Sequence, residues 1–355
     1  MRIRFLTSTP LSVRAGSGTY VGIRTLAGAV RAAGAEVEIV TPSIRLPVYT
    51  LERLLYNETL RFRRDRSDVT VGFDMDGYRV VRRGRTPHVA SIKGVIADEM
   101  RHESGVTRAT MAIQAHCEAE HVRRADLVMT TSRYAAGRLE ELYGIPRVES
   151  IVPEPIDLAA WREILARNPA PADQGKFTVL SVCRFYPRKR LHLLLDAAAR
   201  LRGGIPDLRV RVVGDGPEAP RLKALWRRLR LQTTVEWLGD VSQAALAEEY
   251  NRADIFCLPS VQEGFGIVFL EAMAAGKAIV AARAAAVPEV VRHGVLVEPD
   301  NAGALAEAIE RLHREPALRT QLAAQGAEWV SRFDSPRVAR LFLAELDRIR
   351  ISSLR

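Results

Sequence analysis

The sequence contains little cysteine, few aromatic residues and no long hydrophobic segment. Its three cysteines, Cys117, Cys183 and Cys257, have no ligand-like spacing, so they indicate neither a disulfide framework nor a zinc site. Aromatic residues make up only 6% of the chain and no RNA- or DNA-binding motif occurs, which argues against a nucleic-acid-binding protein. No apolar run is long enough to span a bilayer.

An apolar targeting core is also missing, because the first hydrophobic stretch, at 2–6, is too short for a secretory signal. We therefore expect a cytoplasmic protein. The net charge of +10 and the pI near 9.9 come from arginine, which far outnumbers lysine. Such a charge fits a nucleic acid partner, an anionic membrane surface or an arginine-rich proteome, and the last explanation is favoured because no arginine tract stands apart from predicted structure.

What the sequence does contain is a repeated alternation of short apolar strands and helices. A chain of 355 residues is longer than a single hydrophobic core usually supports, which suggests two domains. A strand at 2–7, a helix at 20–33 and a strand at 37–40 begin a parallel, doubly wound sheet. A second series of strands starts at 177–183, after a proline-containing linker at 168–175. The predicted fold class is α/β, with two Rossmann-like domains.

Two glutamates, Glu263 and Glu271, flank a junction between a predicted strand at 255–260 and a helix. The free backbone N–H groups and the positive dipole end at the start of a helix suit a bound anion. Gly264 and Gly266 allow that ligand to approach closely. A carboxylate there accepts hydrogen bonds from hydroxyl groups, in which sugars are rich. Two acids placed in this way can serve one ligand.

This stretch resembles the donor-binding loop of the retaining GT4-type glycosyltransferases (glycosyl transferases group 1), whose two glutamates are separated by seven residues, with Gly-Phe-Gly after the first. The resemblance implies the GT-B fold, in which two Rossmann-like domains face a cleft, and a nucleotide-sugar donor bound without a metal. It further implies that the donor's sugar is held by Glu263 and by the backbone of Phe265, Gly266 and Ile267. The nucleotide's ribose would be held by Glu271.

The resemblance extends to other loops of the second domain. Arg184 and Lys189 match an arginine and a lysine that the family places on the donor diphosphate. Fixed cations there stabilise the negative charge that grows as the sugar leaves. The turn glycines Gly214 and Gly216, and the backbone of Leu238 near the nucleobase, are the remaining implied donor contacts.

The matches in the first domain are looser. A loop with Gly16 and Gly18 is expected to approach the donor, and its spacing does not fit a dinucleotide fingerprint, so no NAD site is expected. Asp74 and Asp76 resemble the metal-binding DxD of a different glycosyltransferase class, but two acids in a turn are common and the rest of the chain favours the metal-free class. We expect no metal and no cofactor.

Two positions depart from the family's pattern. Lys93 follows a predicted strand, at the edge of the sheet where ligands bind, in the place of a histidine beside the donor's anomeric carbon. Lysine supplies a cation toward a phosphate or an acidic acceptor, but it cannot act as a neutral hydrogen-bonding group. Glu154 replaces a usual residue on the acceptor side. A solvated loop lysine and a stiff interdomain turn are the alternative interpretations.

Two helices carry arginines on one side. The stretch 53–66 predicts a basic amphipathic helix. The stretch 221–231 predicts a helix whose apolar positions face the core: Leu222, Leu225, Trp226 and Leu229. Contact of this second helix with anionic lipid is the less favoured interpretation, and a solvated basic side is preferred.

The predicted first domain covers residues 1–168, with a C-terminal helix at 335–355 that returns to it, and shapes the acceptor pocket. The second domain, 172–334, binds the nucleotide sugar. We predict transfer of a sugar, with retention, from a UDP- or GDP-sugar to a hydroxyl group of a small-molecule, glycan or lipid-linked acceptor. The leaving phosphate helps to deprotonate that hydroxyl.

Three alternatives to this function stay open at this point. They are a nucleotide-sugar hydrolase or epimerase on the same fold, a sugar-nucleotide sensor without turnover, and a basic nucleic-acid-binding protein. The sequence fixes neither the base, the sugar nor the acceptor. It also leaves open the oligomeric state and a peripheral contact with the inner face of the membrane.

Overall fold

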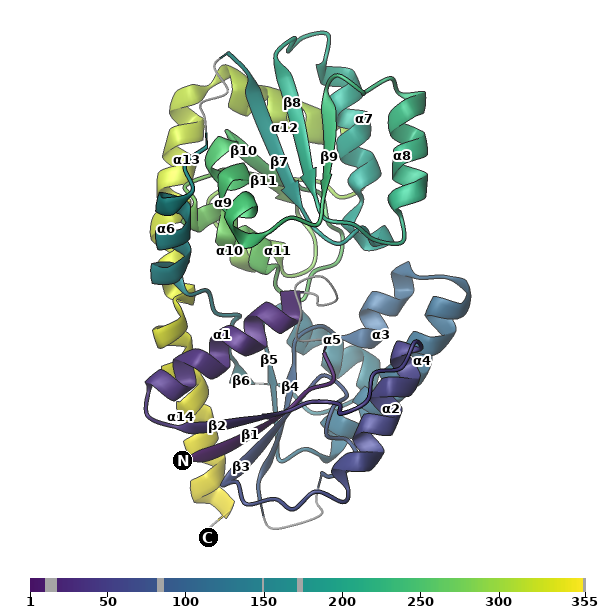
Figure 1. Cartoon of the computed structure of the whole chain (residues 1–355), viewed down its shortest axis with the longest axis vertical. Coiled ribbons are helices and arrows are strands. Elements are labelled where there is room, and N and C mark those ends of the chain that lie inside the picture. The colour runs from purple at the N-terminus through teal and green to yellow at the C-terminus, as the bar shows by residue number, and fades with distance from the viewer. Residues whose placement is uncertain (10–17, 82–85, 149, 171–174, 354–355) are drawn as a thin grey trace. The chain divides into compact units, whose positions relative to one another are not determined.

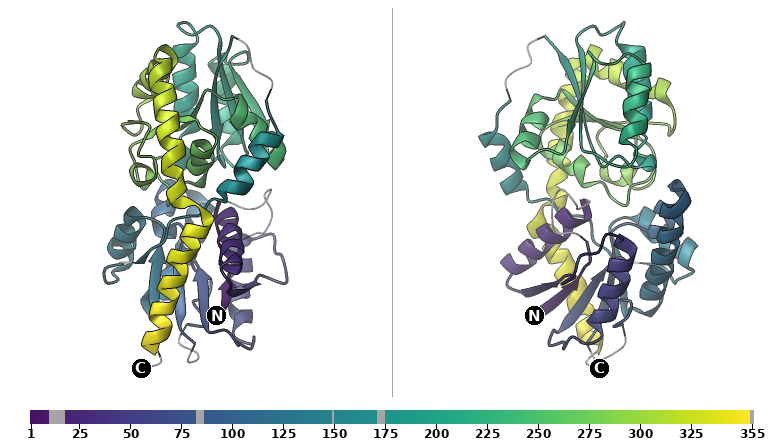
Figure 2. Two further views of the ribbon diagram at one scale, coloured as in Figure 1. Left: turned by 90° about the vertical axis from the view of Figure 1, so that its left-hand side faces the viewer. Right: turned by 45° about the vertical axis from the view of Figure 1, so that its right-hand side comes forward.

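The chain forms two compact units, each built around one six-stranded sheet (Figure 1). The computed structural model describes residues 1–9, 18–81, 86–148, 150–170 and 175–353. Unit 1 comprises Met1–Pro155 and Phe333–Arg355, and unit 2 comprises Ile156–Arg332. All strand pairs within both sheets are parallel, and helices flank each sheet, as the further views in Figure 2 show. The predicted α/β class with two Rossmann-like domains is confirmed.

The sheet of unit 1 has the strand order β2-β1-β3-β4-β5-β6. Strand β1 pairs with β2 on one side and with β3 on the other, so the order of the chain reverses there. In open α/β sheets such a reversal places a ligand-binding crevice at the carboxyl ends of the two diverging strands. The strands are β1 Arg2–Leu6, β2 Glu36–Val40, β3 Val69–Phe73, β4 His88–Ile92, β5 Leu127–Thr130 and β6 Ser150–Ile151.

The core of unit 1 includes the C-terminal helix of the chain. Helices α1 and α14 pack together, and α14 buries Phe342 against Phe5, whose ring meets those of Phe73 and Phe342 edge-on at 5.1 and 5.8 Å. Ser132 caps α5, because its side chain accepts a hydrogen bond from the N–H of Ala135. The helices are α1 Gly18–Ala32, α2 Tyr49–Leu60, α3 Ile96–Glu99, α4 Gly105–Arg124, α5 Arg133–Tyr143 and α14 Ser335–Ser353.

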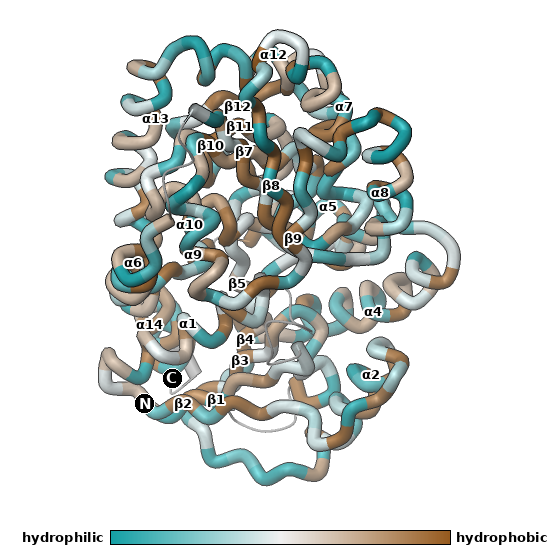
Figure 3. Tube along the Cα trace, turned by 45° about the horizontal axis from the view of Figure 1, so that its top comes forward, coloured by the Kyte–Doolittle hydropathy of each residue, from teal (hydrophilic) through white to brown (hydrophobic). Residues whose placement is uncertain are grey.

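The sheet of unit 2 has the order β12-β11-β10-β7-β8-β9, and here the chain reverses between β7 and β10. Every residue of β7, β10 and β11 is buried, as expected for parallel strands covered on both faces, and Figure 3 shows these strands as largely hydrophobic. The strands are β7 Phe177–Val182, β8 Leu208–Val213, β9 Val235–Gly239, β10 Ile255–Leu258, β11 Ala278–Ala282 and β12 Val295–Val297. The helices are α6 Leu158–Arg167, α7 Leu191–Leu201, α8 Ala219–Arg228, α9 Gln243–Arg252, α10 Ile267–Ala274, α11 Val287–Val290, α12 Ala302–Arg314 and α13 Pro316–Trp329.

Helix α6 belongs to unit 2, although the predicted first domain extended to residue 168. The division falls between Pro155 and Ile156 instead. Trp161 of α6 meets Tyr250 of α9 edge-on at 5.6 Å, and the amide of Asn251 donates to two carbonyl groups at the end of α6. These contacts join residues more than eighty positions apart in the sequence. The predicted boundary depended on a local signal, the prolines of the linker, which carries no information about such contacts.

The predicted helices at 53–66 and 221–231 differ from the observed ones. Helix α2 spans Tyr49–Leu60 and leaves 61–66 outside it. Its apolar periodicity is misleading, because polar residues occupy much of its buried side. Helix α8 ends at Arg228, and of its four expected core residues only Leu222 is fully buried.

The two aspartates of the DxD sequence are part of the buried framework of unit 1. Asp76 is fully buried and accepts hydrogen bonds from the N–H and hydroxyl of Ser8, at 2.6 and 2.7 Å, and from the amide of Asn57 at 3.1 Å. Asp74 accepts from the N–H of Lys93 at 2.8 Å, and burial raises its pKa to about 6. Among the described residues there is no cluster of three side chains that could hold a metal, and no helix is both long and apolar enough to cross a membrane.

Two buried histidines form a chain of hydrogen bonds beside these aspartates. The Nε2 atoms of His88 and His121 lie 2.8 Å apart, Thr70 Oγ1 lies 2.7 Å from His88 Nδ1, and the carbonyl of Asp74 lies 2.5 Å from His121 Nδ1. A carbonyl only accepts, so His121 carries its proton on Nδ1 and accepts from His88 Nε2–H, while His88 Nδ1 accepts from Thr70. This assignment holds for two neutral rings, which burial favours by lowering both pKa values.

We predict that both imidazole rings stay uncharged at pH values well below the usual pKa of histidine. Burial lowers the pKa of His88, and it lowers that of His121 to about 4. A histidine in the unfolded chain titrates at about pH 6.5. The contribution of the two rings to stability is therefore complete above that pH and is lost as the pH falls toward 4. The raised pKa of Asp74 has the opposite effect on stability, which it lowers as the pH rises through this range. The charge on the two rings is therefore a cleaner measurement than the free energy of unfolding.

Ring charge is measured by ¹⁵N NMR of the imidazole groups between pH 7 and about pH 4.5, the window set by these shifts. The expected spectrum shows a His121 Nδ1–H tautomer and a His88 Nε2–H tautomer throughout. The exposed ring of His116 in the same spectrum serves as the solvent-accessible reference. Titration of either buried ring near pH 6.5 would contradict the assignment.

Candidate functional site

The loops that follow β7 and β10 meet at the reversal point of the unit 2 sheet. The loop after β7 contains Arg184 and a short 3₁₀ turn, Pro187–Lys189. The loop after β10 contains Glu263. The N–H of Val261 donates to the carbonyl of Arg188 at 3.0 Å, which fastens the two loops together. The edge of the sheet thus brings cations and a carboxylate from distant parts of the sequence to one place.

Lys189 and Glu263 form an ion pair at this point, with Nζ and Oε1 2.5 Å apart. Their side chains are only 13% and 9% exposed. Charges with so little water around them need partners, and in this structure each is the other's partner. A ligand that carries both an anionic group and hydroxyl groups can satisfy the same two side chains separately.

Arg184 and the turn glycines form the adjoining part of the edge. Arg184 Nη1 lies 3.5 Å from Asp240 Oδ1, and its side chain is one-third exposed. Gly214 has φ +115°, and a Cβ there would lie 2.0 Å from the carbonyl oxygen of Cys183. A Cβ on Gly216 would lie 2.6 Å from the backbone nitrogen of Phe185. The glycines therefore let the turn after β8 lie directly against the segment that carries Arg184.

Helix α10 starts at this edge. Gly266 has φ +93°, and the ring of Phe269 occupies the space beside its Cα, because a Cβ would lie 2.6 Å from that ring. The side chains of Phe265 and Ile267 are buried, so these residues can reach a ligand only through their backbone. Leu238, in β9, is partly buried, and the carbonyl of the next residue, Gly239, accepts from Gly214 N–H at 2.8 Å.

Glu271 lies one turn further along α10, held by two aromatic residues. Its Oε2 accepts a hydrogen bond from the hydroxyl of Tyr250 at 3.0 Å, and its carbonyl accepts from Trp161 Nε1–H at 3.1 Å. Burial raises the pKa of Glu271 to about 7, against the lowering effect of the Tyr250 hydroxyl. Sequence reasoning missed Tyr250 and Trp161, because each looks like an ordinary core aromatic of its own helix.

The three cysteines are free and buried. Burial raises the pKa of Cys183, which lies beside the cation loop, to about 12, and Lys189 counteracts this only in part. The pKa values of Cys117 and Cys257 are raised by burial as well. All three are thiols rather than thiolates near neutral pH, which makes them poor nucleophiles.

Lys93 and Glu154, the two departures from the family's pattern, pair with each other in unit 1. Lys93 follows β4 and Glu154 follows β6, and their side chains, each 4% exposed, meet at 3.1 Å. Lys93 Nζ also lies 5.6 Å from the ring centre of Phe73, at the end of β3. Glu154 Oε2 is buried without a hydrogen-bond partner among the described residues. Lys93 is therefore not a solvated loop residue.

Of the two predicted glycines of unit 1, the structure describes Gly18, which follows β1 in the chain. Gly18 is the first residue of α1. Gly16 lies outside the described residues. The reversal point itself is occupied by the buried Ser8 and Asp76, whose hydrogen bonds join the ends of β1 and β3.

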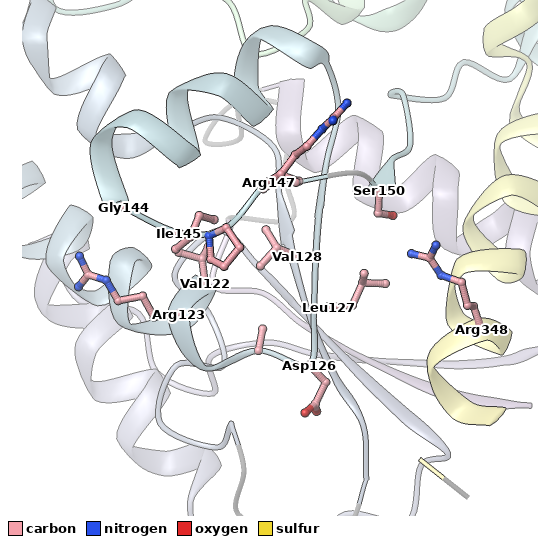
Figure 4. Close-up of a pocket in the computed structure, with 13 residues that line it drawn as sticks. Val122, Arg123, Asp126, Leu127, Val128, Gly144, Ile145, Arg147, Ser150 and Arg348 are labelled. Carbon is pink, nitrogen blue, oxygen red and sulfur yellow. The ribbon is translucent and has the colours of Figure 1, made fainter. Parts of the chain in front are cut away.

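A hollow of about 420 Å³ lies elsewhere in unit 1, at the amino end of β5 (Figure 4). Leu127, Val128 and Ile145 form apolar parts of its wall, and Arg147 and Arg348 lie at its sides. This is the edge of the sheet opposite to Lys93 and Glu154. None of the predicted site residues lines it.

The chain has two Rossmann-like units, each with loops at the carboxyl ends of its parallel strands that suit ligand binding. This arrangement defines an α/β protein of the GT-B class, and the similarity to solved structures supports the same fold. Sucrose-phosphate synthase from Thermosynechococcus elongatus superposes with a TM-score of 0.83 at 22% identity, over 99% of each chain. Anabaena HepE, solved in complex with UDP and glucose, superposes with a TM-score of 0.74 at 19% identity, over 98% of this chain and 100% of HepE. Residues 164–329 match the family described as Glycosyl transferases group 1. This match lies within unit 2, the unit that carries the cation loop and the glutamate loop.

Curated relatives extend the match beyond unit 2. A D-inositol 3-phosphate glycosyltransferase of Pseudarthrobacter chlorophenolicus is 29% identical over 360 residues, which is 87% of this chain and 85% of the relative. A phosphatidyl-myo-inositol mannosyltransferase of Mycobacterium tuberculosis is 35% identical over 203 residues, 55% of this chain and 52% of the relative. The chain spans about half the length of this second relative and of several others that it matches.

We predict that Lys93→Ala lowers the free energy of unfolding of unit 1 by about 3–5 kcal/mol, because it leaves the buried charge of Glu154 without a partner. The double variant Lys93→Met, Glu154→Leu removes both charges and recovers most of that loss. Hydrogen exchange of the β4 amides measures the effect. All four tryptophans lie in unit 2, so their fluorescence follows that unit separately and serves as a control. Equal stability of the single variant and the wild type would contradict a buried ion pair.

Proposed function

We propose that the protein is a retaining glycosyltransferase that moves a sugar from a nucleotide-sugar donor to a hydroxyl group of an acceptor. The observation that carries this proposal is the Lys189–Glu263 pair at the reversal point of the unit 2 sheet. It offers a cation for a phosphate and a carboxylate for sugar hydroxyls within one hydrogen-bond length of each other. The match of residues 164–329 to the glycosyl transferases group 1 family supports the same reaction class.

In the proposed complex, the donor takes over both halves of this ion pair. Its diphosphate binds Lys189 and the partly exposed Arg184, and a sugar hydroxyl donates to Glu263. The backbone at the start of α10 faces the sugar, and the glycine at position 266 supplies the positive φ with which the helix begins. The donor separates this ion pair on binding, and its phosphate and hydroxyl groups replace the contact that is lost.

The ribose of the nucleotide binds Glu271 in this proposal. Tyr250 holds one carboxylate oxygen of Glu271, and the other is then available to accept from a ribose hydroxyl. Trp161 fixes the same residue through its backbone carbonyl. Glu271 thus has a defined orientation, which restricts the position of the nucleotide relative to the ion pair.

The chemistry proposed is a substitution on one face of the sugar. The bond between the anomeric carbon and the phosphate oxygen breaks, the acceptor oxygen bonds to the anomeric carbon from the same side, and the acceptor's proton passes to the leaving phosphate oxygen. Lys189 and Arg184 meet the negative charge that develops on the diphosphate. Cys183, the thiol nearest these cations, is protonated and is not assigned a covalent role.

A UDP-sugar is the preferred donor in the proposal, because HepE, which shares the fold, has been solved in complex with UDP and with UDP-glucose. A GDP-sugar is the alternative. The acceptor in the proposal is a hydroxyl compound bound by unit 1, either a small molecule, a glycan or a lipid-linked acceptor. A hydrolase or epimerase would release or convert the sugar without an acceptor, and a sensor would bind the donor without turnover. Product analysis with and without acceptors separates these activities.

The first test is a thermal-shift screen against UDP, GDP, ADP, dTDP and their sugar conjugates. A ligand present at about 100 times its Kd stabilises the native state by about 2.7 kcal/mol, so one nucleotide series should raise the melting temperature. We expect the shift to disappear in Lys189→Ala and to persist in Arg190→Ala, which removes a cation of the same loop that pairs with Asp300 instead. Circular dichroism confirms that each variant is folded. No shift with any nucleotide, or an unchanged shift in Lys189→Ala, would refute the donor site.

The pKa of Glu271 gives the donor affinity a pH dependence. Below about pH 7 its carboxyl group is protonated and accepts hydrogen bonds less well, so nucleotide binding should weaken as the pH falls. Isothermal titration calorimetry should show about a fivefold loss of affinity between about pH 7 and about pH 6, beyond the effect of the phosphates' own titration. Glu271→Gln, which cannot titrate, supplies that background. An identical pH profile in the two proteins would exclude Glu271 from the site.

A further inference from the structure

The hollow at the amino end of β5 begins where the sheet of unit 1 is incompletely covered. Strand β5 pairs with β4 along its whole length, from Leu127 to Thr130. Among the described residues, β6 pairs with Met129 and Thr130 but not with Leu127 or Val128, and these last two are only partly buried. Both line the hollow, together with 144–148 between α5 and β6. We call this space, of about 420 Å³, the β5 hollow.

The β5 hollow is positively charged. Three arginines line it, namely Arg123, Arg147 and Arg348. Asp126 is the one acidic residue among the described residues of its wall. It accepts a hydrogen bond from the backbone N–H of His88 at 2.8 Å, and Figure 4 shows its carboxylate directed away from Arg147 and Arg348. A carboxylate of the wall thus does not neutralise these arginines.

Arg147 and Arg348 are better placed than Arg123 to bind an anion. Arg123 donates from two nitrogens to the carbonyl of Tyr143, at 3.2 and 2.9 Å, and so joins the end of α4 to the end of α5. Arg147 is exposed and forms no ion pair with a described residue. Arg348 lies 2.8 Å from a carboxylate oxygen of Glu345, one turn earlier on α14, and its side chain is 56% exposed. Exposed pairs of this kind contribute little, so another anion can compete for the arginine.

The hydroxyl of Ser150 is an independent indication of a ligand. Ser150, the first residue of β6, is only 3% exposed, and its Oγ has no hydrogen-bond partner among the described residues. Figure 4 shows this hydroxyl and the guanidinium group of Arg348 directed toward each other across the hollow. A buried hydroxyl group without a partner costs about 1–3 kcal/mol. A ligand that accepts hydrogen bonds from both residues removes this cost.

We propose that the β5 hollow binds a small organic phosphate, with the phosphate group on Arg147, Arg348 and the hydroxyl of Ser150. A phosphate monoester presents three terminal oxygens, which suit two guanidinium groups and a hydroxyl, whereas a carboxylate presents only two. The organic part lies against Leu127 and Val128. The volume of about 420 Å³ is more than a phosphate ion alone needs, and it lies within the roughly 300–1,000 Å³ of small-molecule sites.

The β5 hollow lies at the edge of the sheet opposite to Lys93 and Glu154, so its occupant takes no part in the sugar transfer proposed above. Its connection to that edge is β6, because Ser150 precedes Glu154 by only four residues. A phosphate held by Ser150 therefore stabilises the strand that leads to the buried ion pair. The inference does not depend on the donor site, which lies in unit 2.

The test is isothermal titration calorimetry of the full chain with phenyl phosphate, in a buffer without phosphate. We expect phenyl phosphate to bind roughly tenfold more tightly than inorganic phosphate, because its ring covers the apolar wall. Arg147→Gln with Arg348→Gln should weaken binding about tenfold or more for each arginine. Ser150→Ala should weaken it about fivefold and leave the free protein at least as stable as the wild type, since the hydroxyl has no partner to lose.

Two controls separate this site from the donor site. Phenyl phosphate carries the group that the donor site is proposed to bind, so the titration is repeated in Lys189→Ala, where binding should persist. The Arg147→Gln, Arg348→Gln variant should conversely keep its nucleotide thermal shift, so the two proposals can fail independently. Arg108→Gln with Arg340→Gln changes exposed arginines of α4 and α14 that do not line the hollow, and should bind as the wild type does.

Hydrogen exchange locates the bound phosphate, because protection of the β6 amides should rise when phenyl phosphate is added. Absence of binding, or equal binding by the wild type and the Arg147→Gln, Arg348→Gln variant, would overturn the proposal. So would loss of binding in Lys189→Ala, because the donor site would then be the place where the probe binds. Equal affinity for benzoate would overturn the assignment of the ligand as a phosphate.

Discussion

Parallel strand pairing is the constraint on which the arrangement of both units depends. It brings the carboxyl ends of all strands to one edge of a sheet, and the reversal of strand order opens a space between two of them. In unit 2 this edge receives a cation loop from β7 and a glutamate loop from β10. The sheet needs covered faces and buried apolar strands to exist, so the same burial that stabilises it also removes water from the charged groups at its edge.

Removal of water explains why the charged groups at these edges occur in pairs. Lys189 with Glu263, Lys93 with Glu154 and Arg53 with Asp76 are each largely buried, and each pair sums to no net charge. A buried ion without a partner would cost several kcal/mol, so each member fixes the position of the other. In unit 2 the result is a site whose groups are held in place by mutual attraction and can still be separated by a ligand with complementary charges.

The sequence was sufficient for the fold class, for most strands, and for which residues follow them, because apolar runs and glycine turns are local signals. It could not show that Tyr250 orients Glu271 or that Trp161 joins α6 to unit 2, since those contacts depend on packing between distant helices. Helix α2 was misplaced because its periodicity is inverted: the rule that apolar residues face inward fails where a polar network fills the interior.

The pairing of Lys93 with Glu154 also has a consequence for how the sequence can change over time. A change at either position alone passes through a form with an uncompensated buried charge, whereas a joint change does not. The two positions, sixty-one residues apart in the sequence, should therefore behave as a single unit of substitution. A chain that acquired the lysine without the glutamate would be selected against for its folding before its chemistry was ever tested.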